Sequence, residues 1–243
     1  RQMCIRDRKE NMSKIGIIGA MEEEVAKLKE QMNEVSIRTK AAMEFNRGKL
    51  NGKEVVVVRS GIGKVNAGIC TQILVDDYQV DAIINTGIAG SLKSQIDIGD
   101  IVVSTDTLQH DMDATGFGYA KGQIPRMDVL SFPADENLIK LAMSVCERVN
   151  PEIHVFAGRV VSGDQFVSDR EVKNQIKSDF DGFCTEMEGA AIAQAAYLNQ
   201  VPYVVLRAIS DKADDSATMD YPTFEREAIG HCVKLVENMV KEL

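Results

Sequence analysis

The stretch "DAIINTGIAG", residues 81–90, runs from consecutive apolar residues into a glycine-rich turn. An apolar run without alternation is typical of a strand buried on both faces of a sheet. Similar runs recur along the chain with helical periodicity between them, at residues 14–20, 54–58, 154–164 and 202–211. Since no linker or repeat interrupts this alternation, the sequence predicts one α/β domain with a central mixed, largely parallel sheet flanked by helices.

The segments between these runs predict the remaining elements. Asn51-Gly52 lies between two extended runs and indicates a hairpin. Residues 105–133 contain glycine, proline and aromatics without a clear period, which is typical of a functional loop. A strand "DIVVS" precedes this loop, and a short strand leads into residue 185. Helices are expected at 21–32, within 60–78, at 134–149, 168–178 and 190–200, and from about Phe224.

Composition restricts the kinds of partner. The 243 residues carry a formal net charge of −9, and no basic run follows the first ten residues, so nucleic-acid binding is not expected. No apolar run approaches the ~20 residues of a membrane span. A small-molecule partner is the better expectation. Residues 1–11 are polar and unpatterned, and we expect them to be a disordered extension preceding a domain of residues 12–243.

The cysteines and histidines argue against a metal centre. Five cysteines are scattered without CxxC spacing, which favours a reducing, cytoplasmic location over disulfides or zinc. His110 has Asp111 and Asp113 beside it, so a metal site is conceivable there, although a solvated loop is the simpler interpretation. No metal and no cofactor are expected.

Polar residues follow most of the predicted strands. In open α/β sheets, ligands bind outside the carboxyl ends of the strands, so these residues are candidates for one site. The glycines of "SGIGKVNAG" do not match a dinucleotide fingerprint, because Asn66 stands where the third glycine belongs. The candidates are Met21 with Glu22–Glu24, Ser60–Gly63, Thr86–Gly90, Ser162–Asp164 with Phe166, Glu186–Glu188, and Arg207 with Ser210 and Asp211.

Two features of these strand ends call for partners. Arg207 lies inside the apolar "YVVLRAIS", and a buried arginine needs a carboxylate, for which Glu24, Glu186 and Glu188 are candidates. In "TEMEGAA", residues 185–191, the two glutamates are at i and i+2. Side chains so spaced point to opposite sides of a strand and share no helix face, so Glu186 and Glu188 are expected to do separate jobs.

At this point the chain resembles the 5'-methylthioadenosine/S-adenosylhomocysteine nucleosidases of the nucleoside phosphorylase/hydrolase superfamily. The resemblance covers about residues 14–242 through, in order, "IGIIGAMEEEV", "SGIGKVNAG", "IINTGIAGS", "GDIVVS", "TGFGYAKGQIP", "VSGDQF", "TEMEGAAIA" and "VVLRAISDKAD". It implies a nucleoside phosphorylase-like fold and hydrolysis of the N-glycosidic bond of both nucleosides, for methionine salvage and removal of methyl-cycle products. It also implies a homodimer.

The resemblance assigns roles to residues. Glu24 is the general base on water, and Asp211 is the acid that protonates adenine N7, a division between two carboxylates that glycoside hydrolysis generally uses. Glu188 anchors the ribose hydroxyls, whereas Glu186 holds Arg207 and the catalytic water network. The remaining substrate contacts are Met21, Ile62, Ala89, Gly90, Phe166 (stacked on adenine), Val167, Met187, Ser210 and Tyr221, with Phe117, Tyr119 and Pro125 from the partner subunit.

One departure and three rival functions remain. Ile88 stands where the family carries serine, so a hydroxyl that could position water is missing. A phosphorylase on the same fold would need several cations, and only Arg207, Arg59 and Lys64 are available. The sequence is also compatible with a nucleoside-binding sensor without turnover and with a hydrolase of futalosine-type adenosine derivatives.

Overall fold

The computed structural model describes residues 13–214 and 216–243, so the expected extension at 1–11 lies outside the described residues. The elements, in chain order, are β1 (Lys14–Gly19), α1 (Glu22–Glu30), β2 (Asn33–Lys40), β3 (Met43–Leu50), β4 (Lys53–Arg59), α2 (Lys64–Asp76), β5 (Ala82–Ser91), β6 (Ile101–Gln109), η2 (Thr115–Phe117), β7 (Phe132–Pro133), α3 (Glu136–Val149), β8 (Val155–Ser162), α4 (Arg170–Phe180), β9 (Cys184–Glu186), α5 (Gly189–Leu198), β10 (Tyr203–Asp211) and α6 (Ala217–Glu242).

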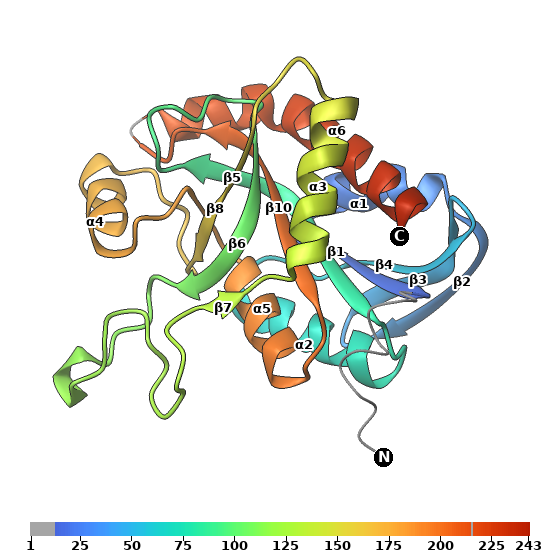
Figure 1. The fold of residues 1–243 in the computed structure, drawn as a ribbon, viewed down its shortest axis with the longest axis horizontal. Coiled ribbons are helices and arrows are strands. Elements are labelled where there is room, and N and C mark those ends of the chain that lie inside the picture. The colour runs from blue at the N-terminus through green and yellow to red at the C-terminus, as the bar shows by residue number, and fades with distance from the viewer. Residues whose placement is uncertain (1–12, 215) are drawn as a thin grey trace.

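The strands form one mixed sheet with parallel pairings at its centre (Figure 1), as the sequence predicts. β1 lies parallel to β4 and β5, and β5 lies parallel to β10. β10 also pairs with β6, so the path β10-β6-β8-β9-β5 closes on itself. β4, β3 and β2 extend the sheet as an antiparallel wing that includes the predicted Asn51-Gly52 hairpin. The sheet is therefore partly closed rather than simply open.

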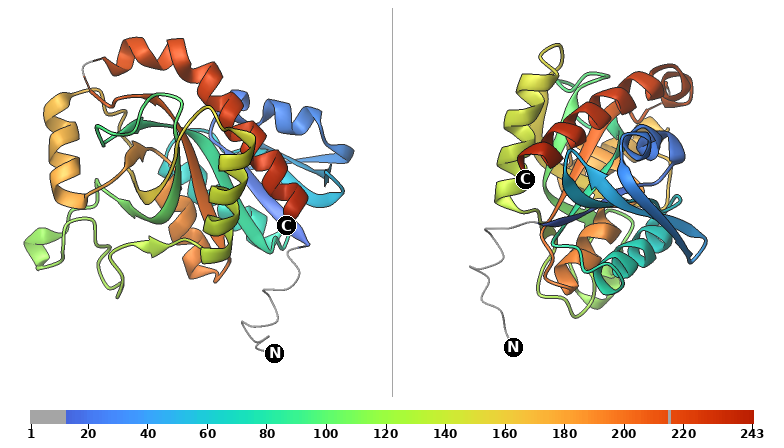
Figure 2. Two further views of the ribbon diagram at one scale, coloured as in Figure 1. Left: turned by 45° about the horizontal axis from the view of Figure 1, so that its top comes forward. Right: turned by 90° about the vertical axis from the view of Figure 1, so that its right-hand side faces the viewer.

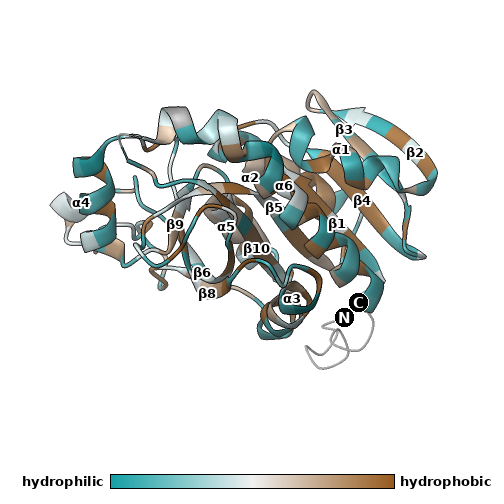
Figure 3. Cartoon of the chain, turned by 90° about the horizontal axis from the view of Figure 1, so that it is seen from above, coloured by the Kyte–Doolittle hydropathy of each residue, from teal (hydrophilic) through white to brown (hydrophobic). Residues whose placement is uncertain are grey.

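The two largest hydrophobic clusters cover the two faces of the sheet. In β4, Val55 and Val57 belong to the cluster that contains residues of α1, α3 and α6, whereas Val56 and Val58 belong to the cluster that contains residues of α2 and α5. Because helices cover both faces, the strand has no polar face, which explains its continuous apolar sequence. Figure 3 shows the hydrophobic residues concentrated on the central strands, with a more hydrophilic α4 at the periphery.

The structure corrects three expectations about elements. β2 was not predicted, because all eight of its residues are exposed and it has no buried face to create a pattern. β6 continues to Gln109, so the irregular segment begins near residue 110 rather than at 105. α6 begins at Ala217 rather than near Phe224, and it contains Pro222, although proline usually ends a helix. Figure 2 shows α6 as the long red helix at the C-terminal end of the chain.

The topology brings the polar strand ends together. The carboxyl ends of the parallel strands β1, β4, β5 and β10 lie at the same edge of the sheet, and α5 begins near this edge. The segment between β6 and β7, which carries η2, projects from the body of the molecule (Figure 1, green). None of the helices in the described residues is long and apolar enough to span a membrane.

Candidate active site

A cavity of about 500 Å³ lies where the strand ends meet, a size suited to a nucleoside-sized ligand. Its described lining contains four carboxylates and neither lysine nor arginine. Every predicted contact of this subunit lines it except Arg207, which lies behind the wall. The predicted contacts that line the cavity are Met21, Glu24, Ile62, Ala89, Gly90, Phe166, Val167, Glu186, Met187, Glu188, Ser210, Asp211 and Tyr221.

Further lining residues were not predicted. Ala20 and Gln165 directly neighbour predicted contacts, so the strand-end rule could have included them. Thr218 and Pro222 were missed because α6 was expected to begin later in the chain. Thr185 completes this set. Phe117, Tyr119 and Pro125 are not among the residues that line this cavity and belong to the projecting segment.

Glu24 is held by backbone N–H groups at the start of α1. Its Oε2 accepts from the N–H groups of Ala20 at 2.7 Å and Met21 at 3.0 Å, and its Oε1 accepts from Ile88 N–H at 3.2 Å. Burial raises the pKa of Glu24, against the opposing effect of Arg207 and these hydrogen bonds. Ile88 therefore contacts the carboxylate through its backbone, and this contact does not depend on its side chain.

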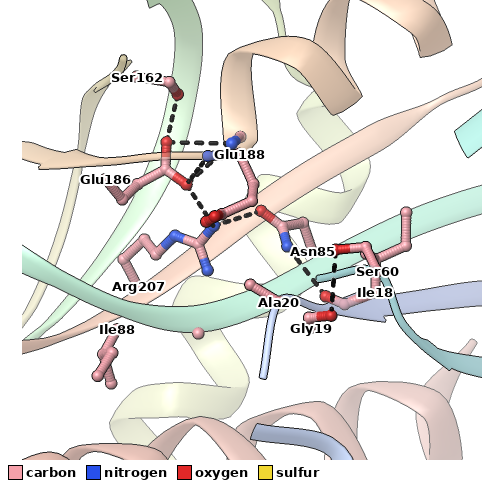
Figure 4. A network of polar contacts seen from close by, with 12 residues as sticks. Ile18, Gly19, Ala20, Ser60, Asn85, Ile88, Ser162, Glu186, Glu188 and Arg207 are labelled. Carbon is pink, nitrogen blue, oxygen red and sulfur yellow. Dashed lines mark hydrogen bonds and ion pairs between the residues drawn. The ribbon is translucent and has the colours of Figure 1, made fainter. Parts of the chain in front are cut away.

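Arg207 is the centre of a buried polar network (Figure 4), and it is 1% exposed. Its Nη2 pairs with Glu186, donates to Asn85 Oδ1 at 2.7 Å and lies 3.8 Å from Glu188 Oε2. The expectation that the two glutamates point to opposite sides is wrong. β9 ends at Glu186, and Glu188 occupies the residue position just before α5, so strand alternation stops between them and both side chains approach one guanidinium.

Glu186 also fixes the N-terminus of α5. Its carboxylate accepts hydrogen bonds from the hydroxyl of Ser162 and from the backbone N–H groups of Glu188 at 3.1 Å and Gly189 at 2.8 Å. Ser162 Oγ in turn accepts a hydrogen bond from Ala190 N–H at 2.7 Å. A carboxylate at this position satisfies N–H groups that have no partner within the helix and complements the helix dipole. Glu186 therefore orients both Arg207 and the helix that carries Glu188.

Glu188 combines deep burial with one backbone N–H donor among the described residues. It is 6% exposed, and its Oε1 accepts from Gly63 N–H at 2.9 Å, at the N-terminus of α2. Burial, and then the neighbouring Glu186 carboxylate, raise the pKa of Glu188 to about 8, against the opposing pull of Arg207. A ligand hydroxyl that donates to Glu188 would favour its ionised form.

Asp211 lies at another part of the cavity wall and has different neighbours. Its Oδ1 accepts from Ala213 N–H at 2.7 Å, and its Oδ2 accepts from the Ser210 hydroxyl at 2.9 Å. Burial is the main cause of its raised pKa, and the acidic side chains of Asp220 and Asp214 add to it, against the opposing effect of the hydrogen bonds from Ala213 and Ser210. These surroundings favour a protonated carboxyl group.

Two glycines of β5 make room for the carboxylates. A Cβ on Gly87 would lie 2.1 Å from Arg207 Nη1 and 2.5 Å from Glu24 Oε1. A Cβ on Gly90 would lie 2.7 Å from Asp211 Oδ1. Since a strand rises about 3.3 Å per residue, the points where β5 meets the two carboxylates are separated by roughly 10 Å along the strand. Glu24 and Asp211 therefore occupy different places in one cavity.

Aromatic side chains border the opening. Phe166 is 46% exposed, and its ring contacts that of Tyr221 edge-on, with the centroids 5.8 Å apart. The Tyr221 hydroxyl lies 3.4 Å from Met21 Sδ. An exposed ring over an acid-lined cavity offers a surface on which a flat base can stack.

The conceivable metal site near His110 has other partners in the structure. Asp111 pairs with Lys64 at 2.6 Å, and Asp113 accepts from the Thr115 hydroxyl at 2.7 Å. Within residues 13–214 and 216–243, no group of three or more His, Cys, Asp or Glu residues is arranged to hold a metal ion.

Comparison with known proteins agrees with this geometry. The sequence profile of the phosphorylase superfamily matches residues 14–241. A 5'-methylthioadenosine/S-adenosylhomocysteine nucleosidase from Staphylococcus haemolyticus is 44% identical over 233 residues, which cover 94% of this chain and 100% of the relative. The chain belongs to this nucleosidase family.

Solved structures place the fold among the same nucleosidases. The Neisseria meningitidis nucleosidase in complex with methylthio-immucillin-A superposes with a TM-score of 0.91 at 38% identity, over 95% of this chain and 100% of that one. A futalosine hydrolase of Helicobacter pylori gives a TM-score of 0.90 at 34% identity, over 96% and 99% of the two chains. The fold is thus shared by a methylthioadenosine/adenosylhomocysteine nucleosidase and a futalosine hydrolase.

Proposed function

We propose that the chain hydrolyses the N-glycosidic bond of 5'-methylthioadenosine and S-adenosylhomocysteine, releasing adenine and the 5-thio-substituted ribose, for methionine salvage and removal of methyl-cycle products. The observation that carries this proposal is the pair of buried carboxylates, Glu24 and Asp211, at separate places in one cavity. Breaking the bond generates an oxocarbenium-like ribosyl cation, which requires a base to activate water and an acid to protonate the leaving adenine.

The surroundings of each carboxylate support a division of roles. Glu24 lies beside Arg207, whose positive charge favours the ionised form that a general base needs. Asp211 has acidic neighbours that favour the protonated form, so it is the donor to adenine N7. Both residues are held by backbone N–H groups, which keep them in place while the proton moves.

The remaining contacts follow the shape of the nucleoside. Glu188 accepts from the two ribose hydroxyls, and Met187 lines the sugar. Phe166 stacks on adenine, and the Val167 backbone contacts the edge of the base. Supporting contacts come from residues that line the same cavity, namely Met21, Ile62, Ala89, Gly90, Ser210 and Tyr221, with Glu186 and Arg207 behind the sugar site.

The cavity does not suit a phosphorylase. A phosphate nucleophile needs cations, yet Arg207 is already shared among three carboxylates, and Lys64 pairs with Asp111. Arg59 is 3.9 Å from Glu22, outside the lining. Adenine release from methylthioadenosine should proceed without phosphate and in EDTA. An absolute need for phosphate, or loss of activity in EDTA, would contradict metal-free hydrolysis. Absence of any adenine release would favour a nucleoside-binding sensor without turnover.

A second candidate function comes from the likeness to the Helicobacter pylori futalosine hydrolase. Such a hydrolase would use the same base, acid and ribose anchor and would differ in the 5' substituent that it accepts. We expect kcat/KM to be highest for methylthioadenosine and adenosylhomocysteine when these are compared with deoxyadenosine and aminodeoxyfutalosine. A clear preference for the futalosine derivative would reverse the assignment.

We also propose that the active unit is a homodimer. Exposed apolar side chains lie on the neighbouring helices α2 and α5, and Phe117 on the projecting segment is 87% exposed. A second copy of the chain could cover such apolar surface in an interface. The exposed side chains are Val65, Ile69, Tyr197 and Leu198.

In that dimer, Phe117, Tyr119 and Pro125 complete the 5' pocket of the partner subunit. Changing Phe117 and Tyr119 to alanine should raise KM for substrates with an apolar 5' group more than for adenosine. Equal effects on both substrates, or a monomer in sedimentation experiments, would contradict this arrangement.

A cytoplasmic location is consistent with the cysteines. Among the described residues, Cys70, Cys146, Cys184 and Cys232 are all buried and free, as expected for a chain that folds in a reducing compartment.

A further inference from the structure

Three loops meet beside the cavity and are joined by one carboxylate. Asp111, which follows β6, accepts from Lys64 Nζ through Oδ1 at 2.6 Å and from the backbone N–H of Asp164 through Oδ2 at 3.0 Å. Lys64 is the first residue of α2, and Asp164 lies between β8 and α4. Asp111 therefore connects segments that lie far apart in sequence.

A second carboxylate closes the connection into a ring. Asp164 Oδ1 accepts from the backbone N–H of Lys64 at 2.8 Å, at the N-terminus of α2, where a negative charge complements the helix dipole. Lys64 Nζ also donates to Gln109 Oε1 at 3.1 Å. Burial opposes ionisation of Asp111, but the bonds from Lys64 and Asp164 keep its pKa below the ordinary value. The ring is thus charged and partly shielded from water.

Close packing supports the ring geometry. A Cβ on Gly63 would lie 3.1 Å from Asp164 Oδ1, and the φ of Gly63, +95°, is one that other residues rarely adopt. A Cβ on Gly163 would lie 3.2 Å from Asp111 Cγ. Glycine at both positions allows the two loops to approach the carboxylates.

The ring is adjacent to two substrate-binding groups. Gly63, which precedes Lys64, donates its N–H to Glu188, the proposed ribose anchor. Asp164 is two residues before Phe166, the proposed adenine platform, and the intervening Gln165 lines the cavity. Displacement of the ring would therefore move an N–H donor of Glu188 and the aromatic ring together.

We propose that Asp111 is a positioning residue, which acts through Lys64 and Asp164 to hold the ribose-binding and adenine-binding loops at a fixed separation. The inference rests on the proposed function, because it assigns those loops to ribose and adenine. Asp111 touches neither Glu24 nor Asp211 in any described hydrogen bond, so it acts on binding rather than on proton transfer.

The test compares Asp111→Ala and Lys64→Met with a matched control, Asp77→Ala. Asp77 also accepts from a lysine, Lys40 at 2.8 Å, and has a similarly shielded side chain, but it lies at the opposite end of α2 from the cavity. Asp111→Ala should raise KM for methylthioadenosine about tenfold or more while kcat changes much less, because the change displaces the ribose-binding and adenine-binding loops and leaves the hydrogen bonds of Glu24 and Asp211 in place.

Additivity and hydrogen exchange complete the design. If the ring acts as a unit, the double variant that combines Asp111→Ala and Lys64→Met should have nearly the same KM as Asp111→Ala alone, because both changes break the same connection. Amide exchange at residues 63–64 and 164–167 should accelerate in both single variants and remain unchanged in Asp77→Ala. This exchange measurement does not depend on turnover, so it remains informative if the wild-type chain releases no adenine and the proposed function fails.

Two results would overturn the inference. One is an unchanged KM in folded Asp111→Ala or Lys64→Met protein, even if exchange is faster. The other is an equal fall in kcat and kcat/KM with no change in exchange, which would place Asp111 in the chemical step instead. If Asp111→Ala does not fold, Lys64→Met decides the question, because that change leaves the backbone N–H of residue 64 in place.

Discussion

The two ends of the cavity contain the same chemical group in opposite electrostatic settings. At one end, Glu24, Glu186 and Glu188 surround the buried guanidinium of Arg207. At the other end, the donors to Asp211 among the described residues are the Ser210 hydroxyl and the Ala213 N–H, and the nearby charges are acidic. Burial raises the pKa of both Glu24 and Asp211, but the nearby charges oppose this effect at one and reinforce it at the other.

This difference supports the proposed division of one acid and one base between two carboxylates. Burial alone would favour the neutral form at both ends. Arg207 behind one end opposes the effect of burial and favours the ionised form that the proposed base needs, whereas the acidic neighbours of Asp211 favour the protonated form that the proposed acid needs. The charges of Glu186, Glu188 and Glu24 offset the cost of burying the arginine, so the contrast depends on these carboxylates, of which Figure 4 labels the first two.

The largest expected effect comes from Asp211→Asn. Asparagine can keep a hydrogen bond to adenine N7 but cannot transfer a proton, so kcat for adenine nucleosides should fall by about 10²–10⁴-fold. A riboside with a nitrophenolate leaving group needs no such proton and should be largely spared. Parallel kinetics on the two substrates, with the melting temperature checked, measure this difference. Equal losses of activity on both substrates would mean that Asp211 has a structural role and does not donate the proton.

The matching change at the other end is Glu24→Gln. Water must be activated whatever group leaves, so adenine nucleosides and nitrophenyl ribosides should both lose activity, by a factor of about 10²–10⁴ for removal of a general base. Steady-state kinetics on the same two substrates test this expectation. If Glu24→Gln spares the nitrophenyl riboside as Asp211→Asn does, the two ends do not have separate roles.

A smaller effect is expected from Glu188→Gln. The carboxylate should bind the 2' and 3' hydroxyls, and a hydrogen bond to a charged group contributes about 1.5–3 kcal/mol, equivalent to roughly 10- to 100-fold in kcat/KM. Ribosides offer both hydroxyls, so they should lose more activity than 2'-deoxyribosides. Identical losses on adenosine and 2'-deoxyadenosine would reject Glu188 as the ribose anchor.

The smallest effect concerns stability without ligand. Because the pKa of Glu188 is raised to about 8 in the folded chain from an ordinary value of 4.5, the native state holds a proton that the unfolded chain releases between those values. The contribution of Glu188 to stability is therefore present below about pH 4.5 and is lost as the pH rises toward 8. Glutamine does not titrate.

The melting temperature of Glu188→Gln relative to wild type should accordingly rise between about pH 5 and pH 8.5. Differential scanning calorimetry on both proteins at the two pH values provides the measurement. A constant difference between the two proteins would mean that Glu188 is ionised throughout this range, as Arg207 favours.

Much of the fold could be predicted from local sequence. Strands such as "DAIINTGIAG" are buried on both faces, so their apolar runs directly indicate a sheet covered by helices. The polar residues that follow these strands indicated the cavity lining, because the carboxyl ends of parallel strands converge. The exposed strand β2 and the start of α6 were not predictable in this way, since neither has a buried pattern or a clear boundary signal.

The sequence by itself determined which groups are available: buried strands, their polar ends and an arginine that required carboxylate partners. Only the tertiary structure decided how those groups are shared. Glu186 and Glu188 converge on Arg207 because the chain changes from strand to helix between them, which the two-residue spacing could not indicate. The ring of Asp111, Lys64 and Asp164 likewise joins residues 47 to 100 positions apart, and long-range contacts of this kind leave no periodic pattern in the sequence.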